Sequence, residues 1–228
     1  MKYVVIGLGY FGAILAEKLS IMGNEVIGVD KEMRKVEGIK DKVAHAICMD
    51  CSDSTAVNGL PLKDTDVVVV AIGEDQGAGI MVTALLRQLQ VKRLISRAVS
   101  PLQETVLRAM GVTEIIHPEE ETAERWSNKL NMDGTIDSLI MNKDFSVVEV
   151  MVPKKYVGRS IEDIDFLKHH NLIVLSSVPI SKEKSAIGLL KNSTKIKSIV
   201  SPKTVLKEEE ILLMYGDNED IKDFIKLG

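Results

Sequence analysis

Features that would mark several specialised protein classes are scarce in this sequence. Cys48 and Cys51 are its only cysteines, so the second C-x-x-C pair that a zinc site would need is missing. The longest apolar run, Val67–Ile72, is far shorter than the roughly 20 residues of a membrane helix. Before Val4 there is no charged leader, apolar segment or cleavage site, so we expect no signal peptide and a cytoplasmic protein.

An excess of basic residues is also missing. Residues 1–134 contain 15 Lys and Arg against 19 Asp and Glu, and residues 135–228 contain 14 of each kind. Neither half therefore has the positive charge expected of a protein that binds a phosphate backbone, and we expect no nucleic-acid partner. Hydrophobic residues make up 45% of the 228 and charged residues 27%, which is ordinary for a globular protein with a sizeable core.

The two cysteines allow three interpretations. Cys48 and Cys51 form a C-x-x-C, with His45 three residues earlier, so they are a redox pair, half of a zinc site, or small residues that end a buried strand. A redox pair usually opens a helix directly after a strand and has thiols of low pKa, which the spacing alone does not establish. We favour the third interpretation.

The first half of the chain alternates between strand and helix patterns. Short runs rich in Val and Ile predict strands over Tyr3–Ile6, Glu25–Val29, Ala44–Cys48, Val67–Ile72, Arg93–Ser96 and Glu114–Ile116. Helical spacing of apolar residues predicts helices over Phe11–Met22, Ile80–Leu89 and Pro101–Met110. Six strands joined by five crossovers predict an α/β fold, a Rossmann-like doubly wound parallel sheet.

The pattern changes after His117. Pro118 opens an acidic helix to about Leu130, and the turn-rich Asn131–Gly134 is expected to be a joint. Strands are then predicted over Phe145–Val152, Leu172–Val178, Lys195–Ile199 and Ile211–Tyr215, with helices over Ile161–His169 and Asp217–Leu227. We therefore predict a nucleotide-binding domain at 1–117, a crossover helix and linker at 118–134, and a small α+β domain at 135–228.

A glycine pattern marks the first turn of the predicted sheet. Gly7, Gly9 and Gly12 form G-x-G-x-x-G between a strand and a helix, the context in which the pattern indicates dinucleotide binding. The three glycines permit a tight turn, the approach of a pyrophosphate to the backbone, and packing of the helix on the strand, respectively. The helix N-terminus then offers free N–H groups and a partial positive charge to the phosphates.

Other polar or small residues follow neighbouring strands at the same sheet edge. Asp30 is placed to accept hydrogen bonds from ribose hydroxyls and to repel a 2′-phosphate, which disfavours NADP. Asp50 reaches adenine or ribose, or else caps a helix in competition with Ser52 and Asp53. Ile72 and Gly73 leave room for a ligand. Arg97 is a phosphate partner or a surface arginine.

No residue is well placed to donate a proton to a substrate. The histidines are His45, at the entry of a strand, His117, and His169 and His170 in the distal domain, and that domain shows no Ser/His/Asp or metal constellation. This favours a nucleotide sensor over an enzyme. Two alternatives stay open: a small NAD-dependent oxidoreductase, and a redox or NAD(H)-sensing module that uses the cysteines.

At the level of whole segments the chain resembles a known family. Val5–Gly12, Gly28–Asp30, Val69–Gly73 and Ile115–Glu119, the last ending in His-Pro-Glu, are similar to the RCK (regulator of potassium conductance) proteins. Within that family the resemblance is to the cytosolic gating subunits of Ktr/Trk-type bacterial potassium uptake systems, which have TrkA-N and TrkA-C domains. It covers essentially the whole chain.

The resemblance implies a regulatory subunit that binds ATP, ADP or NAD(H) and gates a membrane potassium channel or transporter. Homodimers would form through the helix Pro118–Leu130 and assemble into an octameric ring at the inner face of the membrane. Glu119 matches a glutamate that, in some members, lies near the nucleotide phosphates with Mg²⁺ or Ca²⁺. The expected binding residues are Gly7, Leu8, Gly9, Tyr10, Phe11, Gly12, Asp30, Lys31, Asp50, Cys51, Ile72, Gly73, Arg97 and Glu119.

One departure from the family pattern and one loose match affect the expected ligands. Tyr10 stands where Ktr subunits commonly have an arginine that meets the γ-phosphate, which puts discrimination of ATP from ADP in doubt. Some members bind cyclic di-AMP between paired C-terminal domains through a basic residue. Here Lys168, His169 or His170 would have to serve.

Overall fold

The computed structural model describes the backbone of residues 1–131, 135–179, 181–184, 190–193 and 199–226. The chain divides into two compact units, Met1–Glu121 and Thr122–Gly228. The domain limits predicted at 117/118 and 134/135 stay predictions, and most of the expected joint Asn131–Gly134 and of the expected strand Lys195–Ile199 lies outside the described residues. Within the described ranges, no helix is long and apolar enough to cross a membrane.

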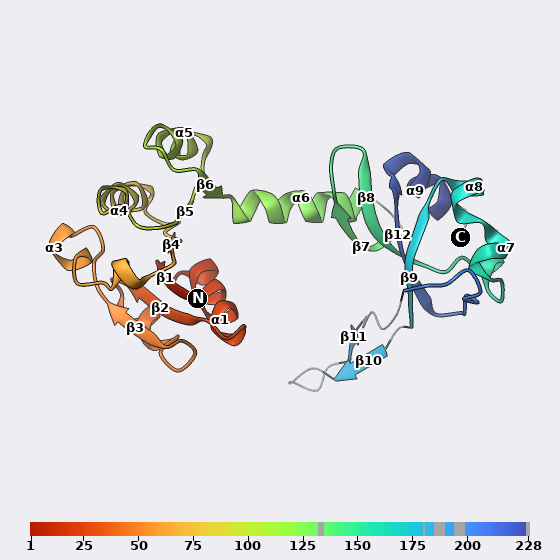
Figure 1. Cartoon of the computed structure of the whole chain (residues 1–228), viewed down its shortest axis with the longest axis horizontal. Coiled ribbons are helices and arrows are strands. Elements are labelled where there is room, and N and C mark those ends of the chain that lie inside the picture. Colours follow the sequence, from red (N-terminus) through yellow and green to blue (C-terminus); the bar gives the residue numbers. More distant parts are fainter. Residues whose placement is uncertain (132–134, 180, 185–189, 194–198, 227–228) are drawn as a thin grey trace. The chain divides into compact units, whose positions relative to one another are not determined.

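The first unit contains the predicted six-stranded parallel sheet (Figure 1). Its elements are β1 Lys2–Ile6, α1 Tyr10–Ile21, β2 Glu25–Asp30, α2 Met33–Glu37, β3 His45–Cys48, α3 Ser54–Val57, a 3-10 turn Leu62–Asp64, β4 Val67–Val70, α4 Gln76–Gln88, β5 Leu94–Arg97, α5 Pro101–Ala109 and β6 Glu114–Ile116. The strand order β3-β2-β1-β4-β5-β6 reverses between β1 and β4, which is the doubly wound arrangement.

Both faces of this sheet are covered, which explains its apolar strands. Val4 and Val68 pack in one cluster with residues of α3 and α4, whereas Val5 and Val69 pack in another with residues of α1 and α2. Alternate residues of one strand point to opposite faces of a sheet, so a strand covered on both sides is apolar throughout. All four residues of β4 are accordingly buried. The covered sheet leaves its carboxyl edge for the loops that follow β1, β2, β4 and β5.

Two boundaries in this unit differ from prediction by more than one residue. α4 begins at Gln76, four residues before the predicted Ile80, because the Asp75 carboxylate accepts a hydrogen bond from the Ala78 amide at 2.9 Å and caps the helix. β4 ends at Val70 and not at Ile72. The following Ala71–Gly73 therefore belong to the loop that leaves the sheet edge.

The crossover helix and the second unit follow. Their elements are α6 Pro118–Asn131, β7 Thr135–Ile140, β8 Phe145–Met151, a 3-10 turn Lys154–Tyr156, α7 Ile161–Ile164, α8 Phe166–His170, β9 Ile173–Pro179, β10 Ser181–Lys184, β11 Leu190–Ser193, β12 Glu210–Asp217 and α9 Asn218–Ile225. The sheet β7-β8-β12-β9 is antiparallel, and β10 pairs with β11 in a separate hairpin. A mixed α+β unit was predicted, although β7, β10 and β11 were not.

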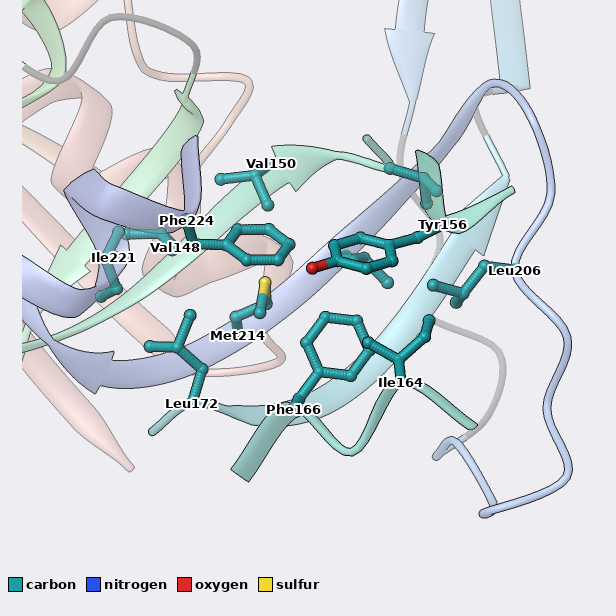
Figure 2. Packing of buried hydrophobic residues seen from close by; sticks show 12 residues of the cluster. Val148, Val150, Tyr156, Ile164, Phe166, Leu172, Leu206, Met214, Ile221 and Phe224 are labelled. Carbon is teal, nitrogen blue, oxygen red and sulfur yellow. The ribbon is translucent and has the colours of Figure 1, made fainter. Parts of the chain in front are cut away.

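A single core packs on the antiparallel sheet of the second unit (Figure 2). Tyr156, Phe166 and Phe224 bring three aromatic rings together, with centroids 5.7 to 5.9 Å apart. Met214 of β12 is fully buried beside them. These large rings help to cover one face of the small sheet.

The helix predicted over Ile161–His169 is wrong as a single element. Asp165 lies in the left-handed region with φ of 47° and separates α7 from α8. The same residue caps α8, since its side chain accepts a hydrogen bond from the Lys168 amide at 3.3 Å. Apolar spacing continued across the break, which is why the pattern did not reveal it.

Candidate functional site

A cavity of about 590 Å³ opens at the carboxyl edge of the parallel sheet in the first unit. This is the position where open α/β sheets bind their ligands. Of the fourteen residues predicted to bind a ligand, twelve line this cavity: Gly7, Gly9, Tyr10, Phe11, Asp30, Lys31, Asp50, Cys51, Ile72, Gly73, Arg97 and Glu119. The structure therefore brings together side chains from loops that span more than a hundred residues of sequence.

The remaining two predicted residues, Leu8 and Gly12, support the turn. Leu8 is buried, and only its backbone amide is directed to the site, as a donor to Asp30 Oδ2 at 2.7 Å. A Cβ atom on Gly12 would stand 1.9 Å from the Gly7 carbonyl oxygen, so no other residue fits there without moving the backbone. Gly7 itself has φ of 94°, which favours glycine.

Asp30 is the most enclosed acidic residue of the cavity. It ends β2, is 9% exposed, and holds its carboxylate by two backbone amides, those of Leu8 at 2.7 Å and of Glu32 at 2.9 Å. Two amide donors fix the direction of the carboxylate. This arrangement suits a side chain that accepts hydrogen bonds from the hydroxyl groups of a ligand.

The N-terminus of α1 has no side-chain cap. Its N-cap is Gly9, whereas α4 and α5 are capped by the side chains of Asp75 and Ser100. The first amides of a helix have no partner within the helix, so an uncapped N-terminus that faces a cavity presents free donors and the positive end of the helix dipole. An anion placed beside Gly9 and Tyr10 would meet these backbone donors.

Arg97, the last residue of β5, lines the same cavity. Its guanidinium forms an ion pair with Glu119, donates to the Ala71 carbonyl oxygen at 3.4 Å, and lies 5.5 Å from the centroid of the Phe11 ring. A Cβ atom on Gly73 would come within 2.6 Å of the guanidinium, so this glycine makes room for the arginine. Arg97 is therefore no exposed surface arginine, and its pairing with Glu119 was not predicted.

Lys35 also lines the cavity and was missed by the sequence analysis. It comes from α2 and forms ion pairs with Glu32 at 2.7 Å and with Glu74 at 3.5 Å. The hydrogen bond with Glu32 raises the pKa of Lys35, and desolvation opposes that rise. The i,i+3 spacing of Glu32 and Lys35 could have indicated their ion pair from the sequence, but only the fold brings Glu74 beside Lys35.

Asp50 and Cys51 line the cavity just beyond the end of β3. Asp50 accepts hydrogen bonds from the Ser52 hydroxyl at 2.6 Å and amide at 2.9 Å, which lower its pKa, and the cap of α3 is Asp53. Cys51 is buried, and desolvation, followed by the charges of Asp50 and Asp30, raises the pKa of its thiol to about 12. A thiol with that pKa is not a nucleophile at neutral pH.

The cysteine prediction needs one correction. Cys48 does end β3, but it is exposed and contacts the Lys31 carbonyl oxygen at 3.4 Å, whereas Cys51 lies beyond the strand in the core. β3 is an edge strand, so the side chain at its end is not covered. Within the described part of the chain, no three His, Cys, Asp or Glu side chains gather as a metal site.

The sheet order, the glycine turn and the Asp30 position define a Rossmann-type domain, and comparisons with known proteins agree. A TrkA-N domain matches residues 3–118. Ktr system potassium uptake protein C of Bacillus subtilis (strain 168) is 30% identical over 227 residues, which cover 99% of this chain and 96% of that protein. Protein A of the same system is 26% identical, covering 100% and 96%. The chain belongs to the family of Ktr system potassium uptake proteins.

Solved structures share the fold at low identity. The chain superposes on the RCK domain of GsuK with a TM-score of 0.61 at 14% identity, covering 99% of this chain and 47% of that one. A GsuK channel bound to NAD gives the same score and identity, with 100% of this chain and 39% of the channel covered. These structures confirm the α/β fold predicted from the sequence, and the TrkA-N match and the Ktr relatives confirm the predicted family.

Proposed function

We propose that this protein is a nucleotide-sensing regulatory subunit that gates a membrane potassium uptake channel or transporter. The observation that carries the proposal is one cavity lined by both an uncapped helix N-terminus and a fixed strand-end carboxylate, Asp30. These groups match the phosphates and the ribose hydroxyls of an adenine nucleotide. The Bacillus relatives, matched over nearly their full length, support the potassium uptake system as the partner.

Gating requires the ligand to interact differently with two states of the protein. The pairing of Arg97 with Glu119 supplies such a difference, because a ligand phosphate that takes Arg97 leaves the Glu119 carboxylate without its partner. Glu119 is the second residue of α6, so the change occurs at the start of that helix. We propose that ligand energy is converted there into a conformational bias, with no bond broken.

The proposed effectors are ATP, ADP or NAD(H). In the first test, the purified protein is heated with each of these, and with NADPH and cyclic di-AMP, and the melting temperature is compared with that of the free protein. Asp30→Ala should weaken nucleotide binding by roughly 1.5–3 kcal/mol, the cost of losing hydrogen bonds to a charged group. Asp30→Asn serves as the matched control of similar shape. Unchanged calorimetric affinity in both variants would remove Asp30 from the site.

A divalent cation is part of the proposal for triphosphates. The Glu119 carboxylate beside nucleotide phosphates is repulsive unless Mg²⁺ or Ca²⁺ lies between them, and both ions prefer oxygen ligands. We expect Glu119→Gln to abolish the cation dependence of ATP binding and to leave ADP binding nearly intact. ATP titrations with and without the cation, in both proteins, provide the measurement. Identical cation responses in the two proteins would mean that Glu119 acts only at the helix N-terminus and as the ion-pair partner of Arg97.

The proposed partners include a second copy of the chain, bound through α6, and an octameric ring at the inner face of the membrane. Trp126 is 54% exposed and Leu130 is 74% exposed, and at spacing i,i+4 the two share one side of the helix. Light scattering at micromolar concentration should show a dimer or a larger ring. A monomer under those conditions would contradict this assembly, and Leu130→Glu should shift the distribution towards it.

Cyclic di-AMP is proposed as a second ligand, in the C-terminal unit. Of the basic residues considered for it, Lys168 and His169 are exposed, whereas His170 packs on Phe224 and contacts the Tyr156 hydroxyl at 2.6 Å. The exposed pair therefore supports the proposal better than His170 does. Calorimetric titration of the wild type and of Lys168→Gln should show weaker binding in the variant. Equal heats in the two proteins would exclude Lys168 from the cyclic di-AMP site.

We propose that the protein is not an enzyme. The burial and raised pKa of Cys51 do not support redox sensing by a thiol pair, and the lining of the cavity offers no histidine among its described residues. NADH should therefore not be oxidised with small 2-hydroxy or 2-keto acids. Steady oxidation that depends on such a substrate, and disappears when Gly9 is replaced by a bulky residue, would support the oxidoreductase alternative instead.

A further inference from the structure

The charged side chains that line the cavity are mostly acidic. Six carboxylates come from the described lining residues: Asp30, Glu32, Asp50, Glu74, Asp75 and Glu119. Three cationic side chains accompany them: Lys31, Lys35 and Arg97. The fixed charge around the ligand position is thus net negative, which is the opposite of what a highly charged phosphate chain requires.

Two of the three cations are already neutralised by these carboxylates. Lys35 forms ion pairs with Glu32 and Glu74, and Arg97 forms one with Glu119. A ligand phosphate that binds either cation must compete with a carboxylate, and the displaced carboxylate stays close by. Neither cation can therefore offset the repulsion between a terminal phosphate and the cavity without losing an existing partner.

Apart from Lys31, the favourable positive potential comes from the first turn of α1. Its uncapped amides and the helix dipole act over about one turn, which suits a pyrophosphate and gives little to phosphates further away. Tyr10, the first residue of α1, is 90% exposed and lines the cavity with an uncharged phenol. The mouth of the site beside the glycine turn thus adds no cation.

From this distribution we infer that the site selects its adenine ligand by charge. It takes a dinucleotide of the NAD(H) type, whose pyrophosphate is internal, in preference to ATP, and it admits ATP only when a divalent cation neutralises the outer phosphates. The phosphates of NAD⁺ carry about two negative charges, one of them offset by the nicotinamide ring, whereas ATP carries about four. The inference rests on the proposed function and adds the class of effector to it.

The first test compares ligands on the full-length protein without divalent cations. NAD⁺, NADH, ADP and ATP are titrated by calorimetry in a chelator at low and at moderate ionic strength. NAD⁺ should bind at least about tenfold more tightly than ATP. Added salt should strengthen ATP binding relative to NAD⁺, because it screens repulsion, whereas salt would weaken ATP binding to a cationic site.

The outcomes separate the inference from the function on which it rests. ATP binding more tightly than NAD⁺ in the chelator, or weakening with salt, would overturn charge selection and leave nucleotide sensing intact. If no nucleotide binds under any condition, the proposed function falls and the inference falls with it. NAD⁺ affinity that is indifferent to Mg²⁺, together with ATP affinity that rises with Mg²⁺, would support both.

Variants at the cavity mouth sharpen the test. Tyr10→Arg adds a cation and should raise cation-free ATP affinity by about tenfold to a hundredfold, with NAD⁺ changed less than about threefold. Tyr10→Phe is its uncharged control. Glu74→Gln removes one carboxylate and should raise ATP affinity by about two- to fivefold, whereas Glu208→Gln, at an exposed position in the other unit, should have no effect. Equal ATP affinity in the Arg and Phe variants, with no gain in Glu74→Gln, would overturn the inference.

Discussion

The sheets of the two units are covered in different ways. In the first unit, helices cover both faces of a parallel sheet, and the core consists mostly of Val, Ile and Leu. In the second, a core that includes three aromatic rings packs on an antiparallel sheet. Of the nine Phe, Tyr and Trp residues, Trp126, Phe145, Tyr156, Phe166, Tyr215 and Phe224 belong to the second unit.

This difference shows where each unit has room for a ligand. The covered parallel sheet leaves a cavity at its carboxyl edge, and glycines and backbone amides shape it. The first unit depends on the absence of Cβ atoms at Gly12 and Gly73, where they would crowd the Gly7 carbonyl oxygen and the Arg97 guanidinium. The second unit depends on the presence of rings, since removing one leaves a void. The following three predictions test this contrast, from the largest expected effect to the smallest.

Removal of a core ring should affect the second unit alone. Phe224→Ala removes a ring that packs on both Tyr156 and Phe166, and we expect it to lower the free energy of unfolding of that unit by about 3–5 kcal/mol. Ile221→Val, in the same helix, is the milder control, at about 0.5–1.5 kcal/mol. Denaturant unfolding gives the stabilities, and calorimetry tests nucleotide binding by the first unit. Loss of binding in the folded variant would show that the two units are not independent.

Addition of a methyl group should affect the first unit, and differently at two glycines. Gly12→Ala forces a Cβ against the Gly7 carbonyl oxygen, so we expect a loss of about 1–3 kcal/mol in stability together with loss of nucleotide binding. Gly9→Ala meets no atom within 4 Å and has φ of −61°, so the fold should tolerate it.

The measurement for this pair is thermal unfolding with and without nucleotide. Gly9→Ala should melt close to the wild type and yet gain less from the ligand, because its methyl group stands where a pyrophosphate approaches the backbone. A Gly9→Ala protein that binds normally, or a Gly12→Ala protein as stable as the wild type, would contradict the roles assigned to the two glycines.

Acidification should weaken the second unit slightly. Burial, with smaller effects from Lys155 and His169, lowers the pKa of His170, which packs on Phe166 and Phe224 and accepts a hydrogen bond from Tyr156 when neutral. The unfolded chain therefore binds the proton more readily, so stability is full above the unfolded pKa of about 6.5 and falls as pH drops towards the folded pKa.

Unfolding followed by near-ultraviolet circular dichroism at several pH values measures this slope. His170→Phe should remove it, and Tyr156→Phe should reduce it because the neutral imidazole loses its donor. Stability of the second unit that rises on acidification, or an unchanged slope in His170→Phe, would show that another group is responsible.

Much of the first unit was predictable from the sequence because its signals are local. Strand and helix alternated with clear periods, and the glycine pattern and Asp30 lie within one βαβ segment. A covered parallel sheet also has a nearly obligatory topology, which fixes the edge where strand-end residues meet. The prediction of Asp50, Ile72, Gly73 and Arg97 as neighbours followed from that rule alone, and they line the same cavity.

Tertiary structure decided the partners of the charged groups. Nothing local to Arg97 indicates Glu119, 22 residues later, and nothing near Lys35 indicates Glu74, since both pairs meet only when separate loops converge at the sheet edge. The break at Asp165 was equally hidden, because the apolar spacing runs through it. Periodicity and turn chemistry act over a few residues and are written in the sequence, whereas ion pairing and cavity charge depend on distances in space that only the folded chain sets.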